Sequence, residues 1–547
     1  FDASAIAGTT VVAFESMEYE GVEVAVHADI EDEDQTVYIP DVHTTATAAN
    51  TTHDHVTGAN EDLIITDEEV LTGLKIGNEY TVKGVLMDKS TGEELKVNDE
   101  SITAEETFTA DAADMIITLT YTLDAITLAG TTTVVFENLY SDGALLATHA
   151  DLEDDEQTVY IPEIHTTAKD QTTKINHTEA NKTATIVDTV SYTNLLPGRE
   201  YTVSGTLMDK ETGKAVLADG KEITASTTFT PEKSEGSVDV IFTFDASVVA
   251  PKTVVAFETL TYKKIQIAVH AEIEDKEQTV YIPKVRTSAI DKTTKINHTE
   301  ATKEATIIDT VSYEGLEIGR EYTVKGVLMD KTTGKELLVD EEQIVSEETF
   351  VADKADMTIT LTYTLDAYKL AGKTTVVFET LYTAVTEEMG VEVGRHHEID
   401  DEGQTVYIPE IHTTAADQKT GINHIKSEEQ ATIVDTVLYS HLLPGKEYTV
   451  KGTLMNKKTG EAILINGEEV TVETTFTAEK SEGSVDVIFT FDASAIAPTT
   501  VVAFEHLEYK GIEIAVHEDI EDEDQTVYIP EIGTTALGQD TEDHIEK

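Results

Sequence analysis

Short stretches in which apolar and polar residues alternate run along the whole chain. Residues 200–207 (EYTVSGTL), 238–244 (VDVIFTF) and 253–257 (TVVAF) have a period of two and are rich in Val, Ile, Thr, Tyr and Phe. This pattern is typical of half-buried β-strands. Polar turn sequences of the form LMDKxTG separate consecutive stretches. No segment of a dozen residues has a sustained helical face, so the pattern predicts an all-β protein.

The alternating stretches are organised in repeats. The string QTVYIP occurs five times at intervals of 121 to 126 residues, and each copy is preceded by VVAFE or VVFE. About six to eight short strands in each repeat predict an immunoglobulin-like (CnaB-like) β-sandwich. We expect complete domains at 41–162, 163–283, 284–409 and 410–530. Residues 1–40 then form the C-terminal part of a truncated repeat, and 531–547 the first strand of another.

The joints between repeats have a constant length. From each QTVYIP glutamine to the threonine beyond it is nine residues, with a proline in the middle and almost no glycine or serine. Such joints are short and stiff, so we expect a rod. Because both ends fall inside a repeat, we expect the sequence to be a section of a longer tandem array. The repeats also alternate in type, since SEGSVDVIFTFDAS marks the second and fourth complete domains and LTYTLDA the first and third.

The amino-acid composition argues against several classes of function. The chain has 38 Lys and Arg against 106 Asp and Glu, a net charge of −68. Such a surface repels phosphate backbones and anionic lipid, so we expect neither a nucleic-acid nor a membrane partner. No apolar run approaches the length of a membrane span. The absence of cysteine excludes disulfides, thiolate metal sites and a cysteine nucleophile.

Polar residues recur at strand positions that should be apolar. Thr166, Gln157 and Asp188 each share a strand face with apolar residues two positions away. Burying such groups costs free energy unless each has a hydrogen-bonding partner. Of the paired threonines, the first is the constant one, because Thr287 is followed by Ser288.

Acidic residues and histidines recur at fixed distances from these positions. Each complete repeat has an aspartate 70 residues before the VAFE glutamate, and a histidine lies eight residues before the glutamine of every QTVYIP string. The histidine of the first truncated repeat is His27. Constant spacing of five polar residue types predicts that they meet in one site in each domain.

The VAFE strings, the inward threonine of TTA and the closing DxxQTVYIP resemble the VaFE-repeat, or Thr–Gln ester-bond, domains of Gram-positive bacterial surface adhesins. The resemblance covers essentially the whole chain. It implies that each domain joins a threonine in its first strand to a glutamine in its last by an intramolecular ester. The implied crosslinks are Thr44 to Gln157, Thr166 to Gln278, Thr287 to Gln404 and Thr413 to Gln525, with Gln35 and Thr534 belonging to the truncated repeats. The implied catalytic residues are Asp67, Glu137, His149, Asp188, Glu258, His270, Asp309, Glu379, His396, Asp435, Glu505 and His517.

These residue types suit the chemistry. A threonine hydroxyl is a weak nucleophile that needs a base, and the leaving ammonia needs a proton. His270 is the best base and proton shuttle, provided that a bulge or a strand end lets it reach the glutamine. Adjacent Asp188 and Glu258 cannot both ionise in a core, so one should keep a proton and donate it to the amide oxygen. Either of the two carboxyls could hold that proton.

The sequence therefore predicts a structural stalk of a bacterial cell-surface adhesin or fibre, without metal or cofactor. Crosslinking would occur once in each domain, so the protein would not be an enzyme in the turnover sense. Expected partners are neighbouring repeats of the same longer chain and other copies in a fibre, with any host ligand bound by a domain outside this segment. We expect an extracellular, wall-anchored protein whose anchor is not in this sequence. Two alternatives are a repeat module that binds a glycan or host protein, and an array stiffened by calcium.

The turn lysines, the acidic runs, two histidine clusters and one insertion are weaker signals, and the first two have a simple structural explanation. Lys89, Lys210, Lys331 and Lys457 lie in turns, where we expect solvated side chains rather than isopeptide bonds. The acidic run before each glutamine lacks the glycine and ligand spacing of a calcium loop and is expected to guard a strand edge. The segment from His53 to His55, the pair His396–His397 and an insertion at residues 382–395 are further features without a companion motif.

Overall fold

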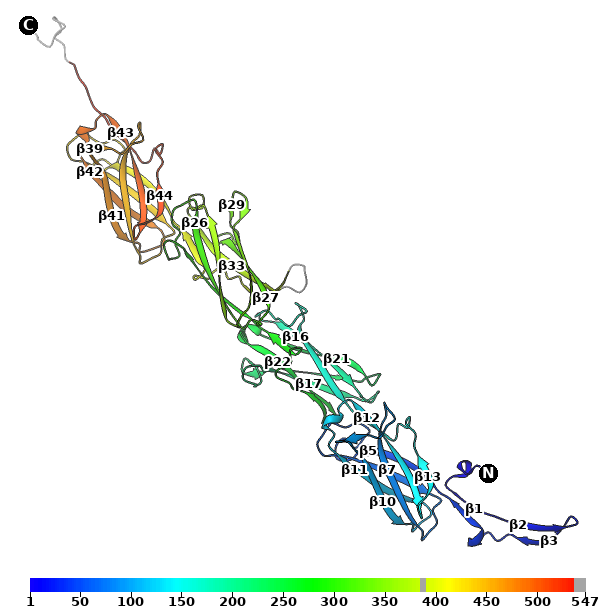
Figure 1. Ribbon diagram of the computed structural model, residues 1–547. Coiled ribbons are helices and arrows are strands. Elements are labelled where there is room, and N and C mark those ends of the chain that lie inside the picture. Colours follow the sequence, from blue (N-terminus) through cyan, green and yellow to red (C-terminus); the bar gives the residue numbers. More distant parts are fainter. Residues whose placement is uncertain (384–389, 536–547) are drawn as a thin grey trace, which may run out of the picture. The chain divides into compact units, whose positions relative to one another are not determined.

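The computed structural model describes residues 1–383 and 390–535. Throughout this part the chain forms β-strands and a few short 3-10 turns, without an α-helix (Figure 1). None of the helical turns within these ranges has the length and apolar character needed to cross a membrane. The chain divides into two compact units, residues 1–282 and 283–547, which are described separately. The predicted all-β class is confirmed.

Residues 163–282 show the architecture of one domain. Its first sheet has the order β15-β16-β21, formed by β15 (Glu163–Asp170), β16 (Ala184–Thr193) and β21 (Gly236–Phe244). Its second sheet has the order β20-β17-β22-β23, with β24 also paired to β22. The strands of the second sheet are β17 (Tyr201–Asp209), β20 (Thr224–Phe229), β22 (Thr253–Tyr262), β23 (Ile265–His270) and β24 (Thr279–Tyr281). All of these pairs are antiparallel.

The core lies between these two sheets. Alternate residues of β16 and β17 are buried, and Ile186, Leu207 and Phe242 belong to one apolar cluster without solvent exposure. Two sheets that bury one face each against the other form a β-sandwich, as the period-two pattern predicts. The domain also has a ribbon of two-residue strands, β18 (Leu217–Ala218) and β19 (Lys221–Glu222), which are too short to show alternation in the sequence.

The other three complete domains repeat this arrangement. The first contains β5 (Asp41–Ala48), β6 (Leu63–Thr72), β7 (Glu79–Asp88), β10 (Thr103–Thr109), β11 (Met115–Leu123), β12 (Thr131–Ser141), β13 (Ala144–His149) and β14 (Thr158–Ile161). The third contains β25 (Lys284–Asp291), β26 (Ala305–Glu314), β27 (Glu321–Asp330), β31 (Val345–Val351), β32 (Met357–Leu365), β33 (Lys373–Thr383), β34 (Val391–His396) and β35 (Thr405–Ile408). The fourth contains β36 (Glu410–Asp417), β37 (Ala431–Ser440), β38 (Glu447–Asn456), β41 (Thr471–Thr477), β42 (Gly483–Phe491), β43 (Thr499–Tyr509), β44 (Ile512–His517) and β45 (Thr526–Ile529).

The predicted truncated repeats differ from the complete domains. Residues 1–40 form two separate two-stranded pairs, β1 (Thr9–Val12) with β4 (Thr36–Ile39) and β2 (Glu15–Tyr19) with β3 (Val22–His27). Residues 531–535 form no strand, because no described strand pairs with them, and 536–547 lie outside the described residues. Of the insertion at 382–395, residues 384–389 also lie outside the described residues.

In every complete domain the first strand touches the segment that leads into the last. The backbone N–H of Ala168 on β15 donates to the carbonyl of Glu277, with 2.9 Å between nitrogen and oxygen. Ala46, Ala289 and Ala415 make the equivalent bond to the residue before the closing glutamine of their own domain, each at 2.9 Å. This contact brings the threonine strand and the glutamine to the same edge of the sandwich.

Candidate functional site

Four polar side chains meet inside each complete domain. In residues 163–282 they are Thr166 on β15, Asp188 on β16, Glu258 on β22 and Gln278 immediately before β24. Asp188, Glu258 and Gln278 have no solvent exposure, and Thr166 is 4% exposed. Because β15 and β16 belong to one sheet and β22 and β24 to the other, the site lies between the two layers.

The reacting groups are in contact. The Thr166 hydroxyl donates to Oε2 of Glu258 at 3.2 Å, and the Gln278 amide nitrogen lies 2.5 Å from the same oxygen. The amide nitrogen of Gln278 also contacts the Thr166 hydroxyl oxygen. Thr413, Glu505 and Gln525 repeat this geometry, with 3.2 Å from hydroxyl to carboxyl and 2.5 Å from amide to carboxyl. A nucleophile, an acyl group and an acid therefore meet in a buried core.

The first and third complete domains bring the same residues together with different contacts. Thr44 donates to Glu137 at 3.3 Å, but the Gln157 amide donates to Oδ1 of Asp67 at 3.2 Å. In the third domain the Gln404 amide donates to Glu379 at 2.6 Å, and the buried Thr287 hydroxyl has no partner among the described residues. Asp309 and Asp435 are also fully buried.

Burial decides the charge of the acid pair. Burial and the neighbouring charge of Asp188 raise the pKa of Glu258 from 4.5 to about 10. The pKa of Asp188 is also raised by burial, but a hydrogen bond from Glu258 opposes that rise. The pKa of Glu137 is raised to about 11, and those of Glu379 and Glu505 well above their usual range, for the same two reasons. Both carboxyls of the pair therefore resist ionisation, and the pair keeps a shared proton, as the sequence predicts.

The acid faces the nitrogen of the amide rather than its oxygen. Oε1 of Gln278 is buried and has no partner among the described residues, as are the corresponding oxygens of Gln157, Gln404 and Gln525. The expected hydrogen bond from the acid to the amide oxygen is not among the contacts of the described residues and stays a prediction. The amide nitrogen of Gln278 instead lies 2.5 Å from Oε2 of Glu258, close enough for a proton to pass between them.

The histidine reaches the site through a bulge and a strand end. His270 is the last residue of β23 and the direct cross-strand partner of Glu258. The register of β22 and β23 shifts between Leu260 and Thr261. Ile267 is buried and the adjacent Ala268 is partly buried, whereas neighbouring residues of a regular strand point to opposite faces. A β-bulge inserts one extra residue and re-aims the side chains beyond it. The bulge recurs in every complete domain.

Sequence reasoning missed the residue that orients this histidine. Asp275 accepts a hydrogen bond from Nε2 of His270 at 2.8 Å. Burial opposes ionisation of Asp275, but the hydrogen bond from His270 lowers its pKa below the usual value. The same bond joins His149 to Asp154, His396 to Asp401 and His517 to Asp522, at 2.8 to 2.9 Å. The sequence offered one signal for Asp275, namely that an aspartate lies three residues before the glutamine in every domain. This member of the acidic run therefore binds the histidine and does not act as the edge guard that we expected.

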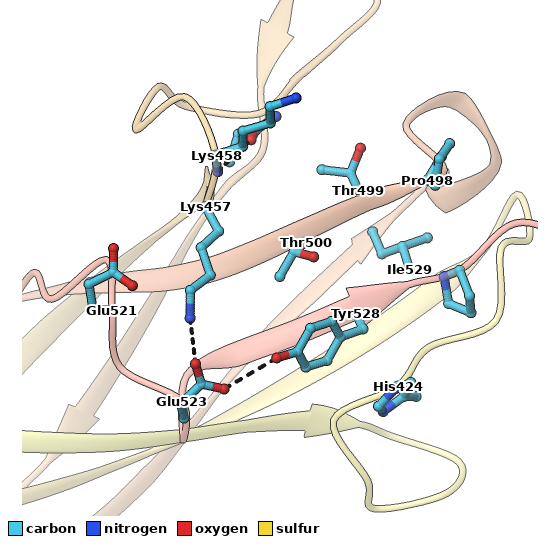
Figure 2. A pocket seen from close by; sticks show the side chains of 12 residues that line it. His424, Lys457, Lys458, Pro498, Thr499, Thr500, Glu521, Glu523, Tyr528 and Ile529 are labelled. Carbon is cyan, nitrogen blue, oxygen red and sulfur yellow. Dashed lines mark hydrogen bonds and ion pairs between the residues drawn. The ribbon is translucent and has the colours of Figure 1, made fainter.

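The turn lysines are also not simply solvated. Nζ of Lys210 donates at 3.1 Å to the hydroxyl of Thr279, the residue after Gln278, and its side chain is only 24% exposed. Lys89, Lys331 and Lys457 make the same bond to Thr158, Thr405 and Thr526 at 2.9 to 3.1 Å. Figure 2 shows Lys457 reaching toward Glu523 beside β45. These lysines fix the start of the strand that follows the glutamine.

The remaining candidate features are a surface pocket, an acidic cluster and the crosslink residues of the truncated repeats. The pocket of about 700 Å³ in Figure 2 is lined by residues such as His424, Lys457 and Tyr528, and by none of the ester residues. Within the described ranges, one group of acidic side chains has the spacing of a metal site, Asp67, Glu69 and Glu137. Gln35 is half-buried and Thr534 exposed, and in the described structure neither contacts a partner for an ester.

Comparison with known proteins identifies the family of the chain. The model of the T-Q ester bond containing domain matches residues 1–39, 40–161, 162–282, 283–408 and 409–529. Similar solved structures include a Mobiluncus mulieris adhesin with intramolecular disulfide, isopeptide and ester crosslinks, at 13% identity over 46% of this chain and 88% of the adhesin, with a TM-score of 0.20. Another is a tetra-tandem repeat from the extending region of a large adhesion protein, at 12% identity over 87% of this chain and 98% of the other, with a TM-score of 0.19. The search of curated proteins found no match. The chain belongs to the family of T-Q ester bond containing domains, as the sequence resemblance implied.

Proposed function

We propose that this chain is a structural segment of a bacterial surface adhesin or fibre, and that each complete domain forms its own Thr–Gln ester. The observation that carries the proposal is the contact of the Thr166 hydroxyl and the Gln278 amide with one buried carboxyl, Glu258. Membership of the ester-bond family supports the same chemistry. The crosslinks join Thr44 to Gln157, Thr166 to Gln278, Thr287 to Gln404 and Thr413 to Gln525.

The reaction is an acyl transfer within one domain. The hydroxyl oxygen of Thr166 attacks the side-chain carbonyl carbon of Gln278, the bond from that carbon to nitrogen breaks, and ammonia leaves. The negative charge of the Asp188–Glu258 pair accepts the threonine proton, and the carboxyl proton of Glu258 goes to the departing nitrogen. His270, oriented by Asp275, exchanges protons between this closed site and solvent. Each site reacts once, so the chain has no turnover.

The position of the bond explains its use in a stalk. Thr166 lies in the first strand of its domain and Gln278 directly before the last. Tension along the chain then passes from one to the other through a covalent bond, and the sandwich between them carries no load. Such a segment suits an extracellular, wall-anchored protein whose ligand is bound by another domain, with neighbouring repeats and other copies in a fibre as partners.

Intact mass of the folded full chain tests the proposal. Each ester removes the mass of one ammonia, so we expect four such losses and a crosslinked peptide pair from each complete domain. The variant Gln278→Ala should show three losses, with the pair from residues 163–282 missing. A wild-type mass equal to that of the unmodified chain would refute the proposed chemistry.

A further inference from the structure

The first complete domain has a third carboxyl in its site. Glu69 on β6 is the direct cross-strand partner of Thr44 on β5. The other three domains have valine at this position, where Val190, Val311 and Val437 are the partners of Thr166, Thr287 and Thr413. One of four otherwise similar sites therefore has an additional acid beside its nucleophile.

Glu69 has no solvent exposure. No amide or hydroxyl of the described residues donates to either of its oxygens, and carboxyl oxygens of Asp67, Glu69 and Glu137 all lie within 4.8 Å of one another. Burial, followed by the charge of Asp67 and a hydrogen bond with it, raises the pKa of Glu69 to about 10. Glu69 therefore keeps its proton and donates it to Asp67.

The aspartate of this site has more donors than its counterparts. Asp67 is hydrogen-bonded by the carboxyls of both Glu137 and Glu69, and its Oδ1 accepts from the Gln157 amide at 3.2 Å. In the second domain the amide of Gln278 contacts Thr166 and Glu258 instead. Hydrogen bonds to an ionised group stabilise its charged form and make it a weaker base.

We propose that Glu69 is a rate-setting residue of the ester site in residues 41–162, and that it makes this domain crosslink more slowly than the other three. The proposal rests on the proposed function. During the reaction the Thr44 oxygen bonds to the side-chain carbon of Gln157, the carbon–nitrogen bond breaks, and ammonia leaves. The Thr44 hydroxyl, which contacts Glu137, gives its proton to the negative charge that Asp67 and Glu137 share, and the nitrogen, which contacts Asp67, takes its proton from the same pair. Glu69 slows the first transfer because it stabilises that charge.

The test follows each crosslink separately in the full chain. The protein is made by cell-free synthesis, samples are denatured at successive times, and the crosslinked peptide of each domain is quantified by mass spectrometry after proteolysis. We expect the Thr44–Gln157 peptide to form about three- to tenfold more slowly than the other three, the effect of a base weakened by one to two pKa units. Glu69→Val, which introduces the residue of the other domains, should bring its rate to theirs.

Two variants make the comparison specific. Glu68→Val makes the same substitution on the exposed face of β6 and should leave the slow rate unchanged. Val190→Glu should slow the second domain alone. Equal rates in all four wild-type domains, or no acceleration by Glu69→Val, would overturn the proposal while leaving the proposed function intact. The absence of every crosslinked peptide would instead refute the proposed function.

A bound cation is the competing interpretation of three close carboxyls. Addition of calcium or EDTA should leave the Thr44–Gln157 rate unchanged if protons occupy the cluster. A rate that responds to EDTA in the wild-type chain but not in Glu69→Val would show that a cation is held there, and would overturn the role of Glu69 as a proton donor.

Discussion

Glu258 and His270 are direct cross-strand partners, at the point where the β22–β23 ladder passes a bulge. The pairing places an imidazole beside the acid that contacts both Thr166 and Gln278. The corresponding pairs are Glu137 with His149, Glu379 with His396 and Glu505 with His517. The imidazole is itself only 15% exposed, which suits the role of proton carrier that we propose for it.

Removing the acid should slow crosslinking without removing either reacting group. Glu258→Gln keeps the shape of the side chain but cannot protonate the leaving nitrogen. We expect the Thr166–Gln278 ester to form about 10²- to 10⁴-fold more slowly, the usual contribution of a positioned acid or base. The time course of the crosslinked peptide measures this, with the other three domains as internal controls. An unchanged rate would contradict the role given to Glu258.

Asp275 should act through His270. Asp275→Asn retains a hydrogen-bonding side chain but removes the charged carboxylate that orients the imidazole of His270. We expect slower ester formation in residues 163–282 and a shift in its pH profile, but a smaller loss than for Glu258→Gln. The matched control is Glu277→Gln, since this neighbouring acid is exposed and makes no contact with His270. Equal effects of the two variants would show that only the net charge of the run matters.

An uncrosslinked domain should lose stability as pH rises. Burial holds the pKa of Glu258 at about 10 in the folded domain against 4.5 for an ordinary glutamate. Between these values the unfolded chain binds fewer protons than the folded one, so the free energy of unfolding falls by up to about 1.4 kcal/mol per pH unit. In Thr166→Ala, which cannot form the ester, hydrogen exchange of β16 and β22 should accelerate from pH 5 to pH 9 beyond its intrinsic rate. Thr166→Ala/Glu258→Gln should show a weaker dependence, because glutamine does not ionise.

Force should distinguish crosslinked from open domains. With all esters formed, pulling the chain by its ends should give no unfolding step of domain size from the four complete domains. Thr166→Ala should introduce one step, because the 112 residues between positions 166 and 278 can then extend by roughly several hundred ångströms, at up to ~3.4 Å per residue. Repeated long steps in the wild-type chain would contradict the proposed load path.

Much of the fold was predictable because the sheets are amphipathic. Alternation in residues 184–193 matches the burial of β16 residue by residue, and the same period placed Thr166 and Asp188 inward. The meeting of Asp188 with Glu258 was suggested by constant spacing, although spacing alone does not tell which strands face each other. The repeats indicated that these residues meet, because the threonine, aspartate, glutamate, histidine and glutamine recur together in every complete domain.

The unpredicted features depend on pairing between strands. A bulge or strand end was expected as the condition for His270 to reach the glutamine, but the register shift between Leu260 and Thr261 leaves no mark in the local alternation, so its position could not be derived. Asp275 was hidden among neighbouring acids of similar composition, and only its hydrogen bond to His270 separates it from them. Lys210 has the sequence context of a solvated turn, but the following strand brings Thr279 within reach of its amino group.

The short distance between one bond and the next has a consequence for chain cleavage. Gln157 and Thr166 are nine residues apart across the joint at Pro162, whereas Thr166 and Gln278 enclose nearly the whole of a domain. Once the esters are formed, a protease that cuts a surface loop between Thr166 and Gln278 leaves both fragments joined through the side chains. Only a cut within the nine-residue joints separates the array. More than nine-tenths of the peptide bonds in the complete domains can therefore be cut without separating the chain into two pieces. A cut in a surface loop does not release the part of the protein beyond it.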